Sequence, residues 1–510
     1  MNHRIAHTSI RTWIRGIALH LIAGLSLWIF PAALFAQSTG ASNVPPNSIE
    51  TPRLFDPSNN TTNPSALSVQ SQNPFLGSVP GGQTDGSPLH LTLKQAIAMA
   101  LRANLGLIDS NVGDDVARAR HLRALSVVLP QLMAESQIAL QTYDLSTIGA
   151  SNLKLPNRDG PFNYGNASVS LRQQVLDMSA IHTIRERAQE EQASAETLRD
   201  ARNIVVLAAT SAYLAAASDG SRVSAAQAEL DAAKATAQLL RDRVDRELSP
   251  EIDSIRSDVA EETAQQRLTL ITVHTEEDKL ALGRIIGVPA NTSIVIDDTM
   301  DFSAPPTTDA GDLENEATTH RADFAAAKSR EAAEGEHVQA ATSERLPTIN
   351  VAASFGGGGK NLGAFYDQYS VQANLQVPIF TGGRIKSDIQ EARAERTRAQ
   401  SETQDLHQRI LFDIRTAQLN LAGAATSVSV AQKNLALAER GLKQSKDRFE
   451  AGMTLAQEVI DSQQAVADAK DNYIRSVYEH NLAKLMLIRA TGTAEEQVGQ
   501  YISVRQASNE

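Results

Sequence analysis

The amino-acid sequence predicts a mainly α-helical protein with transmembrane β-strands, built as two tandem structural repeats. Segments about 205 residues apart match one another, as in Asp242–Ser249 and Asp447–Thr454. Four short segments alternate apolar and polar residues with a period of two, which is typical of strands. A long segment after the fourth of them carries an unbroken coiled-coil heptad. Together, these observations predict the fold class.

The composition sets limits on the class of protein. A chain of 510 residues is too long for one compact core, so we expect two or more structural units. The net charge of −12 disfavours a protein that coats nucleic acid or anionic lipid. Because the chain has no cysteine, it can form no disulfide and perform no thiolate chemistry. The aromatic content of 4% suits long helices rich in alanine and glutamine.

The N-terminus, residues 1–36, has the pattern of a secretory signal peptide. An apolar stretch covers residues 16–30, and a cleavage site follows at Ala36. The basic region before it contains Arg4, Arg11 and Arg15. The alternative is a retained membrane anchor, but the apolar stretch is shorter than the roughly 20 residues that a helical span needs.

The next segment, residues 37–88, is dominated by Ser, Asn, Pro, Thr, Gly and Gln without sustained periodicity. Such a segment buries too little apolar surface to offset its ordering entropy, so we expect a disordered N-terminal arm. No later stretch is expected to span a bilayer as a helix. Any contact with a membrane would therefore be made by the strands.

The two repeats cover residues 89–287 and 312–492, with an inter-repeat linker at 288–311 and a C-terminal tail at 493–510. Each repeat should contain a helix, two strands and a long helical hairpin. The first helices are predicted at 92–128 and 312–345, the strands at 131–141, 166–176, 348–356 and 369–379, and the hairpin tips near 247–250 and 451–455. Each first helix stops at a proline, Pro130 or Pro347, where extended chain is favoured.

The four predicted strands are about ten residues long, which matches tilted strands with lipid on one face and water on the other. In the fourth, apolar Tyr369, Val371, Ala373, Leu375 and Val377 oppose polar Ser370, Gln372, Asn374 and Gln376. The alternative is a half-buried sheet in a soluble protein. Because four strands cannot close a barrel, several chains must pool them. Two, three or four chains would give eight, twelve or sixteen strands, and a conducting pore needs at least three chains.

The heptad in the second hairpin predicts close helix packing. Its positions are Ile414, Ala417, Leu421, Ala424, Val428, Ala431, Leu435, Ala438, Leu442, Ser445 and Phe449. The helix from Gly383 to the turn at Gly452 would be about 100 Å long at 1.5 Å per residue. A helix of this length fits the wall of an extended tube.

Three motifs make the chain similar to the TolC-like outer-membrane efflux family. They are Leu91–Ile97 with Asn104–Leu105, Val377–Arg384, and Arg448 with Gly452 leading to Glu458–Asp461. The resemblance runs from about residue 90 to 492. It implies a homotrimer with a twelve-stranded β-barrel in the cell outer membrane, continued by a long coiled-coil α-helical barrel in the periplasm.

The resemblance also implies a function and partners. The chain would be the passive export duct of a tripartite efflux pump or type I secretion system. Its partners would be a periplasmic adaptor (membrane fusion protein) and an inner-membrane pump of RND, ABC or MFS type. The alternative is a periplasmic coiled-coil scaffold or adaptor that never inserts into the membrane. The cargo is not encoded in any motif that we can identify.

The resemblance assigns roles to three groups of residues. The adaptor-contacting tips would be Glu247, Leu248, Ser249, Gly452, Met453 and Thr454, the pore constriction Glu458 and Asp461, and the entrance latch Asp253. The alternatives are plain loops for the tips and a solvated helix face for the carboxylates. Two rings of carboxylates would favour cations. Phe449 and Thr454 depart from the family's latch residues, which predicts a leakier or differently latched entrance.

The hairpin turns should also differ from each other. Gly452 suits a turn that needs a positive φ, whereas Glu247 holds the equivalent position in repeat 1, so we expect a different geometry there.

No catalytic, cofactor-binding or metal-binding residues are predicted, and we expect no enzyme activity. The segment Phe355–Asn361 lacks the residues of a phosphate-binding loop, so we expect an exposed loop at the outer surface. The eleven histidines show no metal-ligand spacing.

Overall fold

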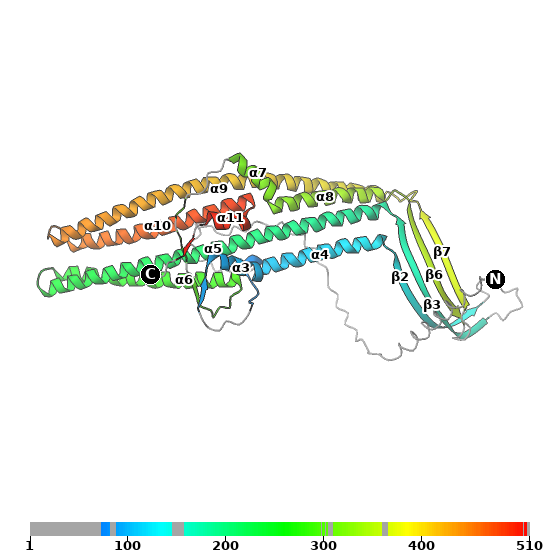
Figure 1. Cartoon of the computed structure of the whole chain (residues 1–510), viewed down its shortest axis with the longest axis horizontal. Helices are drawn as coiled ribbons and strands as arrows, with labels where there is room; N and C mark the ends of the chain where they lie inside the picture. The colour runs from blue at the N-terminus through cyan, green and yellow to red at the C-terminus, as the bar shows by residue number, and fades with distance from the viewer. Residues whose placement is uncertain are drawn as a thin grey trace, which may run out of the picture. The chain divides into compact units, whose positions relative to one another are not determined.

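The fold is taken from a computed structural model, which describes residues 73–81, 88–144, 158–296, 298–300, 302–303, 310–359, 366–502 and 504–506. All of them belong to one structural unit, Thr61–Glu510. The predicted signal peptide and residues 37–72 of the predicted arm lie outside the described residues. Within the unit, long helices run side by side and meet a β-sheet at one end (Figure 1).

The predicted fold class is confirmed in its main features, because the described chain is mostly helical with one four-stranded sheet. Repeat 1 contains β1 (Leu89–Leu91), α3 (Leu93–Ala103), α4 (Leu105–Val128), β2 (Gln131–Asp144), β3 (Arg158–Leu176), α5 (Met178–Asp245) and α6 (Glu251–Ile286). Repeat 2 contains α7 (Ala310–His320), α8 (Ala322–Ser343), β6 (Thr348–Gly359), β7 (Tyr366–Gln376), α9 (Arg384–Glu450) and α10 (Ala456–Thr491). The turns at 246–250 and 451–455 lie within one residue of the predicted tips.

The first helix of each repeat is broken, which corrects the predicted continuous helices 92–128 and 312–345. The breaks fall at Asn104 and Arg321, whose backbones are extended. The Asn104 side chain caps α4 by accepting hydrogen bonds from the backbone N–H groups of Gly106 and Leu107, at 3.0 and 3.4 Å. The buried guanidinium of Arg321 forms ion pairs with Asp323 and Asp413. The Asn104 side chain therefore replaces helical backbone bonding at the first break, whereas Arg321 makes no side-chain cap.

The sheet is antiparallel with the strand order β2-β3-β6-β7, so β2 and β7 are its edges. Three strands are longer than predicted, whereas pairing of β7 ends at Gln376 instead of residue 379. Gly356–Gly359, expected in an exposed loop, continue β6 and pair with Gly165–Ser168 of β3. A Cβ at Gly356 would lie 2.3 Å from the backbone oxygen of Ala167, so close strand approach explains this glycine.

The segments predicted as arm, linker and tail contain ordered elements. Residues 73–81 include η1 (Pro74–Leu76), and the Asn104 side-chain amide donates a hydrogen bond to the Phe75 carbonyl at 2.7 Å. The linker contributes β4 (Ile294–Ile296), which pairs with β1, and β5 (Asp298–Met300). The tail forms α11 (Ala494–Tyr501) and β8 (Val504–Gln506), which pairs with β5. The last part of the arm is therefore ordered, contrary to expectation, and the tail contains a helix and a paired strand.

The predicted heptad lies on the packed side of α9. Ile414, Ala417, Leu421, Val428, Ala431 and Ser445 are buried, and the other heptad residues are partly buried. One core cluster joins α7, α8, α9 and α10 around Ile410, Ile414 and Leu487. The seam therefore holds the hairpin together, as the spacing predicts.

One stretch within the 68-residue helix α5 is long and apolar enough to cross a bilayer, contrary to the expectation from the sequence. However, 72% of that stretch is buried inside the structure. The central residues Ala201–Ser218 form most of the buried part of α5. The same pattern is found in the core helix of a folded protein, so it is weak evidence for a span.

Candidate functional site: a two-faced sheet and a charged hairpin end

The two faces of the four-stranded sheet differ in polarity. Because residues directly opposite one another share a face, the register assigns each side chain to a face. The apolar face is strongly exposed at Leu132 (73%), Ile138 (71%), Tyr369 (83%), Val371 (76%) and Leu375 (66%). An exposed apolar face of this extent indicates an interaction surface.

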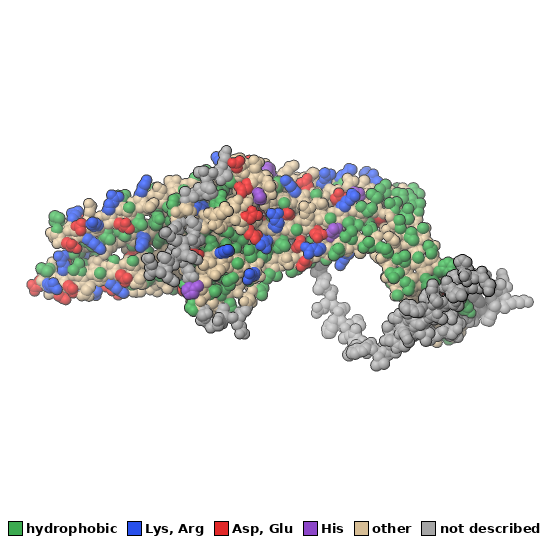
Figure 2. All heavy atoms as spheres, viewed as in Figure 1, with side chains coloured by type: hydrophobic (Ala, Val, Ile, Leu, Met, Phe, Trp, Pro, Cys, Tyr) green, Lys and Arg blue, Asp and Glu red, His purple; other side chains and the backbone are tan. Residues whose placement is uncertain are grey.

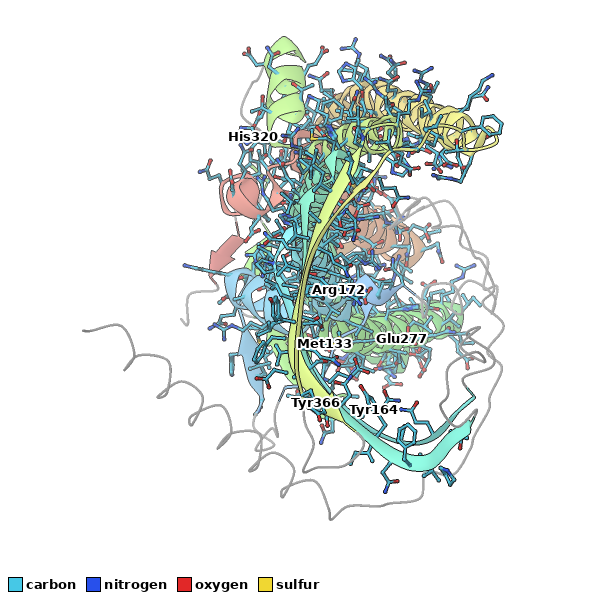
Figure 3. The ribbon with its side chains drawn as sticks, turned by 90° about the vertical axis from the view of Figure 1, so that its right-hand side faces the viewer. Met133, Tyr164, Arg172, Glu277, His320 and Tyr366 are labelled. Atoms are coloured by element: carbon cyan, nitrogen blue, oxygen red, sulfur yellow. The ribbon has the colours of Figure 1, made fainter. Side chains whose placement is uncertain are left out.

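The opposite face carries amide and hydroxyl side chains. Ser354 and Ser370 are hydrogen bonded at 2.9 Å, and the Asn374 amide donates to the Asn350 side-chain oxygen at 3.2 Å. The register also places Met133, Arg172, Tyr164 and Tyr366 on this face. Figure 3 shows these four residues along the sheet, with the two tyrosines nearer the end that is far from the helices. This face is chemically suited to water.

The two hairpin tips at the other end of the unit have the same backbone structure. The Leu248 N–H donates to the Arg243 carbonyl at 2.8 Å, and the Met453 N–H donates to the Arg448 carbonyl at 2.9 Å. Each tip has a second bond. The Glu247 N–H donates to the Val244 carbonyl at 2.9 Å, and the Gly452 N–H donates to the Phe449 carbonyl at 3.0 Å. This pair of bonds is the Schellman motif, which closes a helix C-terminus through one left-handed residue.

The prediction that the first tip has a different geometry is therefore wrong. Glu247 has a φ of 58° and Gly452 a φ of 72°, so both are left-handed. The Schellman hydrogen bonds determine the backbone conformation of both tips. Glu247 adopts the left-handed conformation although it has a Cβ, which disfavours it. The side chains of Leu248 and Met453 are 67% and 66% exposed and are accessible to a partner.

The predicted constriction and latch residues occupy equivalent places in the two repeats. Asp253 and Glu458 are 205 residues apart, and each lies in the first turn of the second helix of its hairpin. The positive end of the helix dipole favours a carboxylate there. Asp253 is buried and forms an ion pair with Arg256 at 3.9 Å, within its own helix. Arg256 is in turn the equivalent of Asp461.

Glu458 and Asp461 lie on one face of α10, as their spacing predicts. Glu458 accepts a hydrogen bond from the Thr454 hydroxyl and lies 3.4 Å from the Arg448 guanidinium. Asp461 is exposed and accepts a hydrogen bond from the Gln457 amide at 2.6 Å. These residues line a shallow depression together with Leu455, Ser462 and Ala465. Repeat 2 therefore presents two accessible carboxylates just beyond its tip.

The two hairpins are joined near their tips by contacts that the sequence patterns did not predict. The Arg243 guanidinium lies 4.6 Å from the ring centroid of Phe449, which is a cation–π contact between α5 and α9. Farther from the tips, the Gln463 amide donates to the Thr236 hydroxyl at 2.8 Å. The 205-residue offset between Arg243 and Arg448 was the available signal for Arg243.

Two arginines continue this link between the hairpins. Arg267 contacts Asp468 at 2.7 Å and Glu229 at 3.3 Å, and Arg222 contacts Asp471 at 2.6 Å. Burial raises the pKa of Glu229, and the Arg267 charge offsets this only in part. Burial also acts to raise the pKa of Asp471, but the hydrogen bond and charge of Arg222 outweigh it and hold the pKa below its usual value. These half-buried pairs are screened less than surface pairs.

In the described part of the chain, no group of three or more His, Asp or Glu side chains is arranged to hold a metal ion. The arrangement instead provides a two-faced sheet at one end and a charged hairpin end at the other.

Comparison with known proteins finds one family match and several relatives. Residues 313–493 match the family described as outer membrane efflux protein. The chain is 24% identical over 225 residues to the outer membrane protein TolC of Vibrio cholerae, covering 42% of this chain and 51% of that protein. It is 27% identical over 237 residues to the pyoverdine export outer membrane protein OpmQ of Pseudomonas aeruginosa, covering 45% and 48%. The chain thus matches about half the length of these relatives.

Solved structures share the fold over a larger part of the chain. The Campylobacter jejuni CmeC outer membrane channel aligns with a TM-score of 0.70 and 16% identity, covering 86% of this chain and 93% of that one. The outer membrane protein VceC of Vibrio cholerae aligns with a TM-score of 0.69 and 18% identity, covering 78% and 96%. At these identities, the likeness is one of fold.

Proposed function

We propose that this TolC-like outer membrane factor, whose family match covers residues 313–493, forms a passive export duct across the outer membrane. The observation that carries the proposal is the four-stranded sheet with one exposed apolar face, joined to helices such as the 67-residue α9. Lipid would cover the apolar face, water would fill the opposite side, and the helices would extend the duct into the periplasm. Export would require no chemistry by the chain itself.

The open edges of the sheet require pairing between copies, and the family resemblance favours a homotrimer. The backbone groups along the outer sides of β2 and β7 need partners in lipid, and β7 of one copy can pair with β2 of the next. Three copies would give a twelve-stranded barrel, the number implied by the family. Head-to-tail contacts of this kind close into a ring when the rotation from one copy to the next is a whole fraction of a turn.

The helices support the same head-to-tail arrangement. Exposed apolar residues line α6 at Ile252, Ile255, Val259, Leu270, Val273 and Leu280, and line α9 at Phe412, Leu419, Val430 and Leu437. Helix α6 carries eight acidic and four basic residues, whereas residues 416–450 of α9 carry three acidic and five basic residues. Pairing α6 of one copy with α9 of another would bury both stripes and bring opposite charges together.

The hairpin end would be the periplasmic entrance. Glu247, Leu248, Ser249, Gly452, Met453 and Thr454 would contact a periplasmic adaptor, which in turn would connect the duct to an inner-membrane pump. Glu458 and Asp461 would form the constriction as two rings of three carboxylates. Asp253 would contribute to the latch through Arg256, and the Arg243–Phe449 contact would take part in it.

The test is reconstitution in planar bilayers, combined with gel migration of membrane fractions with and without boiling. We expect a heat-sensitive trimer band and stable single-channel currents. A monomeric protein that is washed off membranes and passes no current would contradict the duct and favour the non-inserted scaffold.

The constriction is tested by the double variant Glu458→Gln/Asp461→Asn. Removing two carboxylates per subunit should reduce the preference for cations several-fold, on the order of the effect of charged rings on selectivity. The measurement is the reversal potential in a salt gradient. The control is Glu262→Gln, an exposed carboxylate farther along α6. An unchanged reversal potential in the double variant would remove Glu458 and Asp461 from the constriction.

A further inference from the structure

The segment between β7 and α9 carries an unusual pair of exposed side chains. Ile379 is 94% exposed and Phe380 is 89% exposed. Among the described residues, they are the most exposed of the large hydrophobic side chains. Figure 2 shows hydrophobic side chains gathered where the helices meet the sheet. Full exposure of two such residues to water is unfavourable, so a covering partner is expected.

The apolar face of β7 continues into this segment. Backbone pairing with β6 ends at Gln376, but the alternation of apolar residues runs on through Val377 to Ile379. Val377 is 50% exposed and Leu375 is 66% exposed. Ile379 therefore extends the stripe assigned to lipid beyond the hydrogen-bonded sheet.

Positive charge follows directly after this apolar end. Gly382 and Gly383 have φ values of 63° and 93°, and the chain turns through them into α9. Arg384 and Lys386 then follow, both exposed. Arg384 pairs with Glu344 and Asp388, whereas Lys386 makes no ion pair among the described residues. Apolar side chains followed within a few residues by Arg and Lys are typical of the boundary between acyl chains and phosphate groups.

The equivalent junction in repeat 1 lacks this arrangement. Val175 and Leu176 are only 58% and 38% exposed. Asp177 follows at once and caps α5 by accepting a hydrogen bond from the Ala180 N–H at 3.0 Å. In repeat 1, the single residue between strand and helix is therefore the acidic Asp177. The exposed apolar pair and the following cations belong to repeat 2.

We propose that Ile379 and Phe380 form an interfacial anchor in the leaflet on the helical side of the barrel, with Lys386 at the level of the lipid phosphate groups. The proposal rests on the proposed function. A second copy of the chain is the less favoured occupant. A strand of a second copy that pairs with β7 would cover the backbone edge of β7. The Ile379 side chain instead continues a row of side chains that point out of the plane of the sheet, where such a strand does not reach.

The test uses a single tryptophan as a depth probe. The two tryptophans of the sequence, Trp13 and Trp28, both lie in the predicted signal peptide, so Ile379→Trp would give the mature protein one reporter. The full protein is reconstituted in phosphatidylethanolamine–phosphatidylglycerol vesicles with or without brominated acyl chains. We expect brominated lipid to quench the emission of Ile379→Trp. The same loss is expected for Phe380→Trp.

Two further probes make the result decisive. Leu239→Trp, on an exposed position of α5 near the first hairpin tip, should lose no emission. Val371→Trp, on the apolar face of β7, should be quenched if the sheet is in lipid. Quenching of Val371→Trp without quenching of Ile379→Trp overturns the anchor but leaves the duct intact. A blue-shifted but unquenched Ile379→Trp also overturns it, in favour of a subunit contact. If brominated lipid quenches neither Ile379→Trp nor Val371→Trp, the proposed function itself is overturned.

Discussion

Helices α6 and α10 occupy equivalent places in the two repeats, and comparing them separates what the duplication has kept from what it has changed. Each has 36 residues, follows a Schellman turn and ends at a left-handed glycine, Gly287 or Gly492. Their polar residues differ at both ends. Asp253 and Arg256 in α6 correspond to Glu458 and Asp461 in α10. The positions that define the backbone are therefore shared, whereas the charges have diverged.

The strongest test of the shared backbone is substitution of the terminal glycines. An added Cβ at Gly492 would lie 2.8 Å from the backbone N and Cα of Arg321, and at Gly287 it would lie 2.4 Å from the Cβ of Ala103. Both glycines also have a φ near 80°. We expect Gly492→Ala to lower the free energy of unfolding by about 3–5 kcal/mol, since left-handed strain and overpacking add. Chemical unfolding would measure this change.

Gly287→Ala should cost about as much, because the Cβ of Ala103 is fixed to its backbone and cannot move away unless α3 moves. The control is Gly423→Ala in α9, where a Cβ meets open space and helix propensity should improve by about 1 kcal/mol. Equal stability of Gly492→Ala and the unmodified protein would contradict the view that Gly492 is needed for the end of α10 to pack against the backbone of Arg321.

The periodic features of the fold could be predicted from the sequence, because one residue type repeated at a fixed spacing has one physical explanation. The heptad from Ile414 to Phe449 and the alternation in the four strands are of this kind. The spacing of Glu458 and Asp461 likewise sets their common helix face. Their pairing with other chains could not be derived, since it depends on surfaces that several copies must complete.

Features decided by a single side chain were missed. The break at Asn104 depends on its amide capping α4 and reaching Phe75, and nothing in the apolar periodicity marks it. The 217-residue offset to Arg321, equal to that between Pro130 and Pro347, was the available signal. The cation–π contact between Arg243 and Phe449 needed tertiary structure, because 206 residues separate its members.

The far ends of α6 and α10 provide a second contrast, in their response to pH. His480 and Lys484 are buried in α10, where the equivalents in α6 are Thr275 and Lys279. Burial and the nearby Lys484 lower the pKa of His480 to about 4, and burial lowers the pKa of Lys484 to about 8. Neither ring nitrogen of His480 has a hydrogen-bond partner among the described residues. The folded protein therefore disfavours the imidazolium.

Between pH 4 and 6.5 the unfolded chain binds the His480 proton and the folded chain does not, so stability rises with pH across this window. The rise amounts to about 3–4 kcal/mol, because each tenfold difference in proton affinity between the two states contributes about 1.4 kcal/mol. His480→Phe should flatten the stability profile between pH 4.5 and 7, as measured by urea unfolding. His274→Asn, at an exposed position of α6, should leave the profile as it is. An unaltered slope in His480→Phe would show that other groups cause the pH dependence.

The smallest expected effect concerns the tips, where the two repeats have the same backbone conformation but a different residue at the left-handed position. Glu247 holds a left-handed conformation that costs an L-residue about 1–2 kcal/mol, whereas Gly452 adopts it freely. Glu247→Gly should therefore raise the free energy of unfolding by up to about 1 kcal/mol, after the greater entropy of glycine in the unfolded chain is subtracted. Gly452→Ala should lower it by a similar amount, since a Cβ there meets no other atom and only backbone strain is added. Opposite shifts in chemical unfolding would establish that the Schellman hydrogen bonds, and not the residue at the turn, determine both tips. A loss of stability in Glu247→Gly would instead mean that the Glu247 side chain stabilises the first tip.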